Sequence, residues 1–347
     1  MPSIEKKDIR KLNVVQLQQF FVEHGNKAFR GKQVYEWLWK KSLRNFDEMT
    51  NISLETRELL KEHFEIKPTE IDQMQRSVDG TIKNAVKLYD GLVVESVLIP
   101  TEKRITACVS SQVGCSLDCK FCATAKLKRM RNLNADEIYD QVVLISEQGK
   151  EYFQRPLTNI VLMGMGEPLL NYANVMSAMD KITSPEGLGM SPKRITLSTV
   201  GVSKMIRKLA DDDVKFNLAV SLHSAIDEKR SSIMSINDAS PLDELMDSLQ
   251  YWYDRRKSRI TFEYVVWKDF NDSDEDIRAL VKYCKRVPSK VNLIQYNPIG
   301  EELFEQADEE RVAAYERTLE ANGIIAKVRR SRGQDIDAAC GQLANKN

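Results

Sequence analysis

The sequence has no excess of charge of either sign and very little histidine. Its 347 residues include 51 Lys and Arg against 51 Asp and Glu, and only three histidines. A balanced charge neither demands nor excludes a nucleic-acid partner, so any RNA contact has to come from local basic patches. Three histidines also weigh against a zinc site that is built from pairs of cysteine and histidine.

Long apolar runs are absent as well. No segment reaches the roughly 20 apolar residues that a membrane-spanning helix needs. The first ten residues, MPSIEKKDIR, are charged and do not form a secretory signal. A disulfide framework is not expected, because a chain of this length can bury a core without one. We therefore expect a cytoplasmic protein with reduced thiols and no membrane partner.

Three of the six cysteines lie close together in the sequence. Cys115, Cys119 and Cys122, the cysteine triad, have C-x3-C-x2-C spacing, and Phe121 precedes the last of them. A [4Fe–4S] cluster that is held by three thiolates keeps one iron free to bind a small molecule and to pass it an electron. The spacing resembles the signature of the radical S-adenosylmethionine (SAM) superfamily. This resemblance implies that the open iron chelates the amino and carboxylate groups of SAM.

A structural zinc site is the alternative explanation of the same residues. C-x2-C is also a zinc spacing, and Cys108 offers a fourth thiolate. Zinc ligands usually come as two well-separated pairs, whereas none of His24, His63 and His223 lies near the triad. The corresponding function is a non-enzymatic, zinc-dependent RNA-binding module. Brown protein with about four irons per chain would exclude it.

The first hundred residues contain helical and then alternating patterns. Helical spacing of apolar residues occurs in three stretches, which are 14–24, 29–41 and one that begins at Ser53. Alternation predicts three strands, which are 71–76, 81–89 and 92–99. We expect residues 1–68 to form a small helical accessory domain and residues 69–100 to form a β connector.

Residues 101–332 repeat a strand followed by a helix. The predicted strands are 105–110, 159–163, 194–199, 216–222, 259–266 and 291–296. The predicted helices are 134–148, 172–182, 203–210, 241–256, 273–285 and 308–322. Six such units indicate an α/β fold, a parallel and partial (β/α)6 barrel. Barrel active sites lie at the C-terminal ends of the strands, where the triad follows the first strand.

Several residues at the ends of the later strands are candidate SAM ligands at this rim. They are Gly166, Glu167, Ser198, Ser221, Leu222, His223 and Asn297. Gly166 and Glu167 resemble the Gly-Gly-Glu element of radical SAM barrels, which implies that they contact the amino group of SAM. The others are expected to bind the ribose, carboxylate and adenine of SAM. Each one alone is also explained as a cap or a strand-end hydrogen bond.

Three cysteines lie outside the triad. Cys108 belongs to the first predicted strand of the barrel, so we expect it close to the cluster. Cys340 lies in residues 333–347, whose glycines and lack of periodicity predict a flexible loop that can reach over the barrel mouth. Cys284 falls in a predicted helix and is expected to be an inert buried thiol. That explanation also remains open for Cys108 and Cys340.

Four segments together carry a more specific signal. They are VESVLIP at 94–100, CVSSQVGC at 108–115, MGMGEPL at 163–169 and GQDIDAACGQL at 333–343. This set resembles the RlmN family of dual-specificity RNA methyltransferases, over nearly the whole chain. The resemblance implies methylation of carbon 2 of one adenine in the peptidyl-transferase centre of 23S rRNA. It also implies methylation of the adenine 3′ to the anticodon in tRNAs.

The resemblance further implies roles for single residues and a use of two SAM molecules per turnover. One SAM methylates Cys340 to S-methylcysteine, and a second SAM is cleaved at the cluster to a radical that takes hydrogen from this methyl group. The resulting carbon adds to the adenine as a covalent protein–RNA adduct. Cys108 helps remove the carbon-2 proton and forms a disulfide with Cys340, and Glu95 is the proton acceptor. A reducing protein of the flavodoxin or ferredoxin type supplies the electrons.

Two other enzyme classes remain open. A carbon-8 adenine rRNA methyltransferase, the antibiotic-resistance relative, shares the cysteines, although 95–100 and 166–171 look more like the carbon-2 enzymes. A radical SAM activase or mutase gives Cys340 no role.

Contact with RNA, which the resemblance implies for the accessory domain 1–68, is the property that the sequence shows least directly. Basic runs at 126–131 and 327–332 would flank the barrel mouth, but charge runs are also typical of solvated faces.

Overall fold

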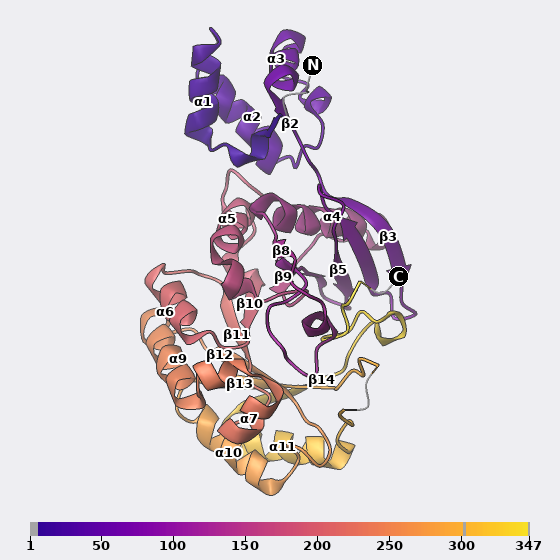
Figure 1. The fold of residues 1–347 in the computed structure, drawn as a ribbon, viewed down its shortest axis with the longest axis vertical. Coiled ribbons are helices and arrows are strands. Elements are labelled where there is room, and N and C mark those ends of the chain that lie inside the picture. Colours follow the sequence, from indigo (N-terminus) through magenta and orange to yellow (C-terminus); the bar gives the residue numbers. More distant parts are fainter. Residues whose placement is uncertain (1–5, 301–302, 346–347) are drawn as a thin grey trace.

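The computed structural model describes residues 6–300 and 303–345. Residues 1–5 lie outside this range, and part of the argument against a secretory signal depends on them. The first residues of the predicted segment 1–68 and the last residues of the predicted segment 333–347 therefore also lie outside it. Figure 1 shows a small helical module at one end of the long axis and a larger body of sheet and helices below it. No helix of the described residues is long and apolar enough to cross a membrane.

The helical module confirms the three predicted N-terminal helices. They are α1 (Val14–Glu23), α2 (Phe29–Trp39) and α3 (Leu54–His63), and a short parallel pair, β1 (Lys7–Asp8) with β2 (Phe64–Glu65), joins the ends of the module. Asn13 and Gln16 form a capping box at the start of α1, and the side chain of Ser53 accepts a hydrogen bond at the start of α3. The helices therefore begin where their caps stand in the sequence.

The larger body is built on one sheet of ten strands. Its antiparallel part consists of β3 (Glu70–Arg76), β4 (Ile82–Lys87) and β5 (Val93–Pro100). Its parallel part consists of β6 (Ile105–Cys108), β9 (Asn159–Leu162), β10 (Ile195–Thr199), β11 (Asn217–Ser221), β12 (Ile260–Val265), β13 (Ser289–Ile294) and β14 (Ile325–Arg329). The strand order is β14-β13-β12-β11-β10-β9-β6-β5-β4-β3. The sheet is thus open, with β14 and β3 at its edges.

Helices connect the parallel strands, as the repeated pattern predicted. They are α4 (Ala135–Phe153), α5 (Tyr172–Thr183), α6 (Ser203–Asp211), α9 (Leu242–Arg256), α10 (Asp274–Cys284) and α11 (Glu309–Ala321). Two short helices, α7 (Asp227–Ile233) and α8 (Ile236–Ala239), and the strand pair β7 (Gln112–Val113) and β8 (Arg131–Asn132) were not predicted. The α/β class and the parallel, incomplete barrel are confirmed.

Two features differ from the prediction. A seventh parallel strand, β14, follows α11 and pairs with β13. The strands of the predicted connector are also continuous with the barrel, because β5 pairs antiparallel with β6. The chain therefore passes from the connector into the main sheet without a break in hydrogen bonding.

A buried ion-pair cluster fastens the helical module to the sheet domain. The guanidinium of Arg10 contacts Asp140 at 2.8 Å and Asp136 at 3.3 Å, both on α4, and Asp8 at 3.4 Å. Arg10 is only 7% exposed. Burial acts to lower the pKa of Arg10, but the three carboxylates outweigh this effect and raise it above its ordinary value. The module is thus held on α4 by a charge that has no access to bulk water.

Candidate active site

The cysteine triad lies on the loop between β7 and β8, which is anchored at both ends. Gly114 has φ +74°, and a Cβ there would lie 2.5 Å from the carbonyl oxygen of Lys128, so the loop turns where only glycine fits. Farther along, Asp118 accepts hydrogen bonds from the backbone and hydroxyl of Ser235, and the Lys120 N–H donates to Ile233 O at 3.1 Å. The region of α7 and α8 therefore supports the triad loop.

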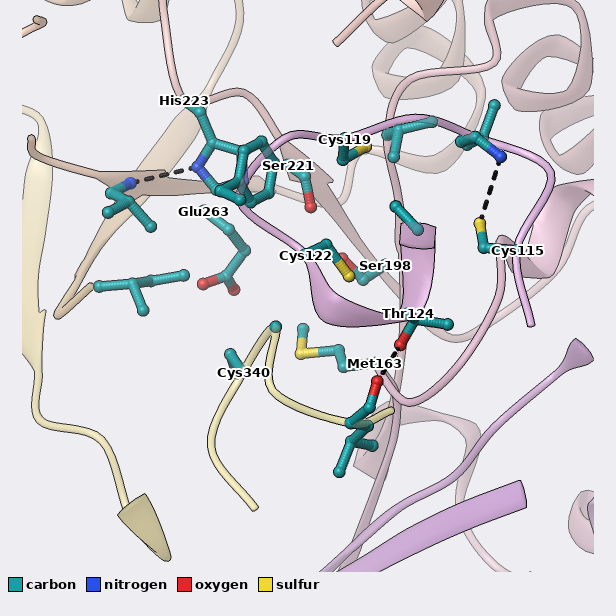
Figure 2. A pocket seen from close by; sticks show the side chains of 18 of the residues that line it. Cys115, Cys119, Cys122, Thr124, Met163, Ser198, Ser221, His223, Glu263 and Cys340 are labelled. Carbon is teal, nitrogen blue, oxygen red and sulfur yellow. Dashed lines mark hydrogen bonds between the residues drawn. The ribbon is translucent and has the colours of Figure 1, made fainter. Parts of the chain in front are cut away.

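The triad lines a cavity of about 170 Å³ at the C-terminal ends of the parallel strands. Figure 2 shows this cavity from close by. Ten of the predicted site residues line it, which are Cys115, Cys119, Cys122, Gly166, Glu167, Ser198, Ser221, His223, Asn297 and Cys340. Cys108, Glu95 and Leu222 are not among its lining residues. Residues from five strands and two loops, far apart in the sequence, thus meet in one place.

The donor set of the triad fits an iron–sulfur cluster. The three triad thiols are free and come from one loop. Burial raises the pKa of Cys115 and Cys119, and the neighbouring thiols of the triad raise it further. Three thiolates can hold a [4Fe–4S] cluster and leave one of its irons open.

Gly166 and Glu167 lie in a tight turn after β9. Gly166 has φ +90°, and a Cβ there would lie 2.4 Å from Cβ of Gln112. The Glu167 carboxylate accepts hydrogen bonds from Leu169 N at 3.0 Å and Val200 N at 2.9 Å. Burial raises the pKa of Glu167 to about 7, although these hydrogen bonds act to lower it. The carboxylate therefore lies fixed in the cavity wall, where the charge of a ligand ammonium would stabilise its ionised form.

Ser198, Ser221 and His223 stand at the ends of β10 and β11. His223 is a left-handed residue, with φ +57°, and its Nδ1 accepts a hydrogen bond from Val265 N at 3.2 Å. Nε2 therefore carries the proton of the neutral ring. Burial, with the charge of Arg230, lowers the pKa of His223 to about 3. A neutral imidazole with an N–H donor thus faces the cavity beside the ring of Phe121, whose centroid is 4.5 Å away.

The Cys340 loop is docked over the cavity rather than hanging free. Ala123 N donates to Gly341 O at 2.7 Å, and the Thr124 hydroxyl donates to Leu343 O at 2.6 Å. The Asn297 side chain donates to Cys340 O at 3.1 Å. Cys340 lines the cavity and is an exposed residue. The prediction of a loop over the barrel mouth is confirmed, but hydrogen bonds fix this loop in the described conformation.

Cys108 lies at the end of β6, behind the cavity. Burial raises its pKa to about 12, and the nearby Cys340 contributes in the same direction. Burial acts to lower the pKa of Arg329, but Glu263, Cys340 and Cys108 raise it above its ordinary value. Arg329, at the end of β14, is thus close to both Cys108 and Cys340. Neither Cys108 nor Cys340 is in a disulfide.

Glu95 is engaged away from the cavity. Its carboxylate accepts hydrogen bonds from the backbone of Ala344 at 2.8 Å and of Asn345 at 3.1 Å, and Lys83 lies 3.4 Å from it. In this conformation Glu95 fixes the C-terminal tail on β5. Leu222 is fully buried, and its backbone N–H donates to Glu263 O at 3.0 Å.

Glu263 is a cavity residue that the sequence prediction missed. It lies on β12, is 4% exposed and lines the cavity with Cys340. Asn292 donates to it at 2.8 Å, and Arg329 lies 3.4 Å away. Burial raises the pKa of Glu263, while Arg329 and the Asn292 hydrogen bond act to lower it. The signal in the sequence was a single carboxylate inside an otherwise apolar buried strand.

Full-length relatives decide the family. A protein of Christiangramia forsetii is 67% identical over 342 residues, which cover 99% of this chain and 97% of the relative. A protein of Flavobacterium psychrophilum is 67% identical over 99% of both chains. Both are named probable dual-specificity RNA methyltransferase RlmN. The chain belongs to the RlmN family.

Family models and a solved structure agree with this membership. The model of the ribosomal RNA large subunit methyltransferase N-terminal domain matches residues 7–66, the helical module of this RlmN chain, and the radical SAM superfamily model matches residues 109–281. The crystal structure of a radical SAM methyltransferase from Sphaerobacter thermophilus superposes with a TM-score of 0.92 at 36% identity, over 98% of this chain and all of that one. The predicted radical SAM barrel is thus confirmed.

Proposed function

We propose that the protein methylates carbon 2 of one adenine in the peptidyl-transferase centre of 23S rRNA and of the adenine 3′ to the anticodon in tRNAs. Its full-length relatives carry the name of a dual-specificity RNA methyltransferase. The observation that carries the proposal is that Cys340 lines the same cavity as the cysteine triad. An activase or mutase has no use for a thiol in that place, whereas a methyl carrier has to lie within reach of the methyl donor.

In this proposal the cavity residues divide into cofactor ligands and a methyl carrier. Cys115, Cys119 and Cys122 hold a [4Fe–4S] cluster, and Cys340 accepts the methyl group. The cavity residues proposed to orient SAM are Gly166, Glu167, Ser198, Ser221, His223 and Asn297, and the backbone of Leu222, between Ser221 and His223, is proposed to join them. The cluster, when bound, supplies the electron that cleaves SAM reductively. Two SAM molecules are used per turnover, one as methyl donor and one as radical source.

Cys108 and Glu95 act after the methyl-derived carbon has joined the adenine. Cys108 helps to remove the carbon-2 proton, and the adduct radical would return one electron to the cluster. The Cys108 thiolate then attacks the Cys340 sulfur, so that disulfide formation breaks the bond from this sulfur to the methyl-derived carbon, which takes up a proton to complete the methyl group. A disulfide requires Cα atoms within about 7 Å of each other, so this step needs Cys340 to approach Cys108 to that distance. Glu95 becomes a free proton acceptor only when the tail residues Ala344 and Asn345 leave its carboxylate.

The RNA approaches from the barrel mouth in this proposal. Lys126, Lys128 and Arg129 follow the triad, and Arg330 and Arg332 precede the Cys340 loop, so cations flank the cavity on two sides. The target adenine has to leave its stack to reach the cavity. A flavodoxin- or ferredoxin-type reductant and a cytoplasmic location remain predictions from the sequence.

The test is to identify the methylated base directly. Reduced protein is incubated anaerobically with SAM and with unmodified 23S rRNA or tRNA, and the digested RNA is analysed by mass spectrometry against C2- and C8-methyladenosine standards. We expect C2-methyladenosine in both RNAs from the intact chain and none from Cys340→Ala. Cys284→Ala, which removes a buried thiol of α10, is the matched control and is expected to stay active. Methylation at carbon 8, or full activity of Cys340→Ala, would contradict the proposal.

A further inference from the structure

Glu263 presents a buried carboxylate to the candidate active site. In the strand registers, Glu263 of β12 lies beside Ser221 of β11 and Asn292 of β13. Residues that pair across parallel strands project to the same face of the sheet, and Ser221 also lines the cavity. Figure 2 shows the carboxylate directed into the cavity on the side where Cys340 lies. The carboxylate is thus part of the cavity wall next to the methyl-accepting sulfur.

The protein partners of this carboxylate leave part of its bonding capacity unused. Asn292 donates a hydrogen bond to Oε1 at 2.8 Å, and Arg329 donates one to Oε2 at 3.4 Å. An ionised carboxylate has about four acceptor sites, so some remain after these two hydrogen bonds. The side chain of Arg329 is half-buried, with 45% of it exposed, so water screens its charge in part, whereas the side chain of Glu263 is only 5% exposed. A buried negative charge that is only partly compensated favours a cationic ligand.

The proposed methyl transfer puts a cation in this position. SAM carries its positive charge on the sulfonium that bears the methyl group. For the methyl group to move to the Cys340 sulfur, this sulfonium has to lie in the cavity beside Cys340. The Cys340 sulfur attacks as a thiolate, which a neighbouring carboxylate repels unless a positive charge lies close to both. The transfer forms the bond from Cys340 to carbon, breaks the sulfonium–methyl bond and leaves neutral S-adenosylhomocysteine.

We propose that Glu263 is a specificity-determining residue that recognises the sulfonium charge of SAM beside Cys340. The preference of the site for SAM over S-adenosylhomocysteine, which lacks only the methyl group and the charge, then depends on this carboxylate. After transfer the charge is gone, so the same residue favours exchange of the spent product for the second SAM. This inference rests on the proposed function, because it assumes that SAM is the ligand of the cavity.

Binding measurements on the cluster-loaded full chain test the inference. The affinities for SAM and for S-adenosylhomocysteine are measured anaerobically by titration calorimetry for the intact chain, Glu263→Gln and Arg329→Gln. We expect Glu263→Gln to bind SAM about tenfold more weakly, with an unchanged affinity for S-adenosylhomocysteine, because one charge interaction is lost from only one of the two ligands. Arg329→Gln removes the other partner of the ion pair and is expected to keep or increase the preference for SAM.

Each other outcome has a definite meaning. Equal losses for both ligands in Glu263→Gln would give the residue a merely structural role and overturn the inference, as would an unchanged preference. Loss of the preference in Arg329→Gln would assign the effect to the broken ion pair and also overturn it. Glu263→Asp keeps the charge and should retain the preference for SAM. A loss of this preference in Glu263→Asp would overturn the inference, even if Glu263→Gln fails to hold a cluster. An intact chain that binds no SAM would instead overturn the proposed function.

Discussion

Cys108 and Cys340 illustrate how much of the proposed chemistry depends on single side chains. If Cys108 closes a disulfide with Cys340 to release the product, then Cys108→Ala can still form the adduct but cannot resolve it. We expect a covalent protein–RNA species on denaturing gels and a fall in product release of about 10²-fold or more. Cys284→Ala should show no such species. If Cys108→Ala were slow but accumulated no adduct, Cys108 would instead act in a step before the adduct forms.

Arg10 is the single residue on which the attachment of the helical module depends most. Replacing it with Met keeps most of its volume but leaves the buried carboxylates of Asp8 and Asp140 without their cation, whereas Asp136 keeps its ion pair with Lys11. We expect the free energy of unfolding to fall by about 3–5 kcal/mol, which is the usual cost of breaking a buried ion pair. Urea denaturation measures it. Lys257→Met, in an exposed pair with Asp254, should change little, and an equal loss in both variants would refute the assignment.

His223 makes stability depend on pH in a predictable direction. Burial lowers its pKa in the folded chain to about 3 from an ordinary 6.5. Between these values the unfolded chain binds a proton that the folded chain does not, so this contribution to stability is complete above pH 6.5 and is lost as the pH falls. One proton corresponds to about 1.4 kcal/mol per pH unit. Asparagine tolerates the left-handed backbone, so His223→Asn is the suitable variant. Its free energy of unfolding, measured by denaturation at several pH values below 6.5, should fall less steeply with falling pH, by this slope. If the free energies of unfolding of the intact chain and of His223→Asn changed with pH in parallel, the ring would already be protonated in the folded chain, and its pKa would not be lowered.

The residues that sequence alone identified are those whose chemistry is marked by spacing. The triad, Glu167 and Cys340 stand in short motifs, and all of them line the cavity. Glu263 has no motif around it, and its place in the site follows from the register of β11, β12 and β13, which a single sequence does not specify. The engagement of Glu95 with Ala344 is equally hidden, because the two residues are 249 positions apart.

At the level of elements, local signals predicted the helices and most strands. Caps such as Asn13 and Ser53 marked where helices begin, and alternation marked β3, β4 and β5. The strand β14 was missed because its sequence, IAKVR, is short and two of its five residues are charged. At an edge of the sheet, it does not need apolar residues on both faces. The Cys340 loop was expected to be flexible because of its glycines and its lack of periodicity. Its anchors, Thr124 and Asn297, lie in distant parts of the chain, so these local signals do not reveal them.

Gly31 controls how closely α1 and α2 approach. A Cβ at Gly31 would lie 2.4 Å from Gln18 N and 2.7 Å from Leu17 C, both in the backbone of α1. In an open helix, Gly→Ala stabilises by about 1 kcal/mol, but here the overlap forces the helices apart at a cost of about 1–3 kcal/mol. We therefore expect Gly31→Ala to destabilise the protein in thermal unfolding. Gly25→Asn, where φ is +72° and no atom lies within 4 Å, should be tolerated, whereas a more stable Gly31→Ala would contradict the packing argument.

For the whole molecule, the C-terminal segment links the two edges of the open sheet. It leaves β14 at one edge and reaches the turn between β3 and β4 near the other, where Gly333 N donates to Asp79 at 3.0 Å. Figure 1 shows its path back from β14 towards β3 and β5. Along this path lie the contacts with Asn297 and Thr124 at the cavity. The position of Cys340 is therefore set by contacts with parts of the chain from both sides of the barrel.

Asp335 is the place to test this dependence, because it fastens the segment to the β3–β4 turn. Its carboxylate accepts hydrogen bonds from the Ser77 hydroxyl at 2.6 Å and from Val78 N at 3.1 Å. In Asp335→Ala we expect faster hydrogen exchange of the backbone amides of 333–343 and a lower yield of methylated Cys340, with exchange in α1–α3 unchanged. Glu320→Ala, an exposed acid on α11, is the control. If exchange rose in Asp335→Ala while Cys340 methylation stayed normal, the anchors at Asn297 and Thr124 alone would be sufficient to position the sulfur.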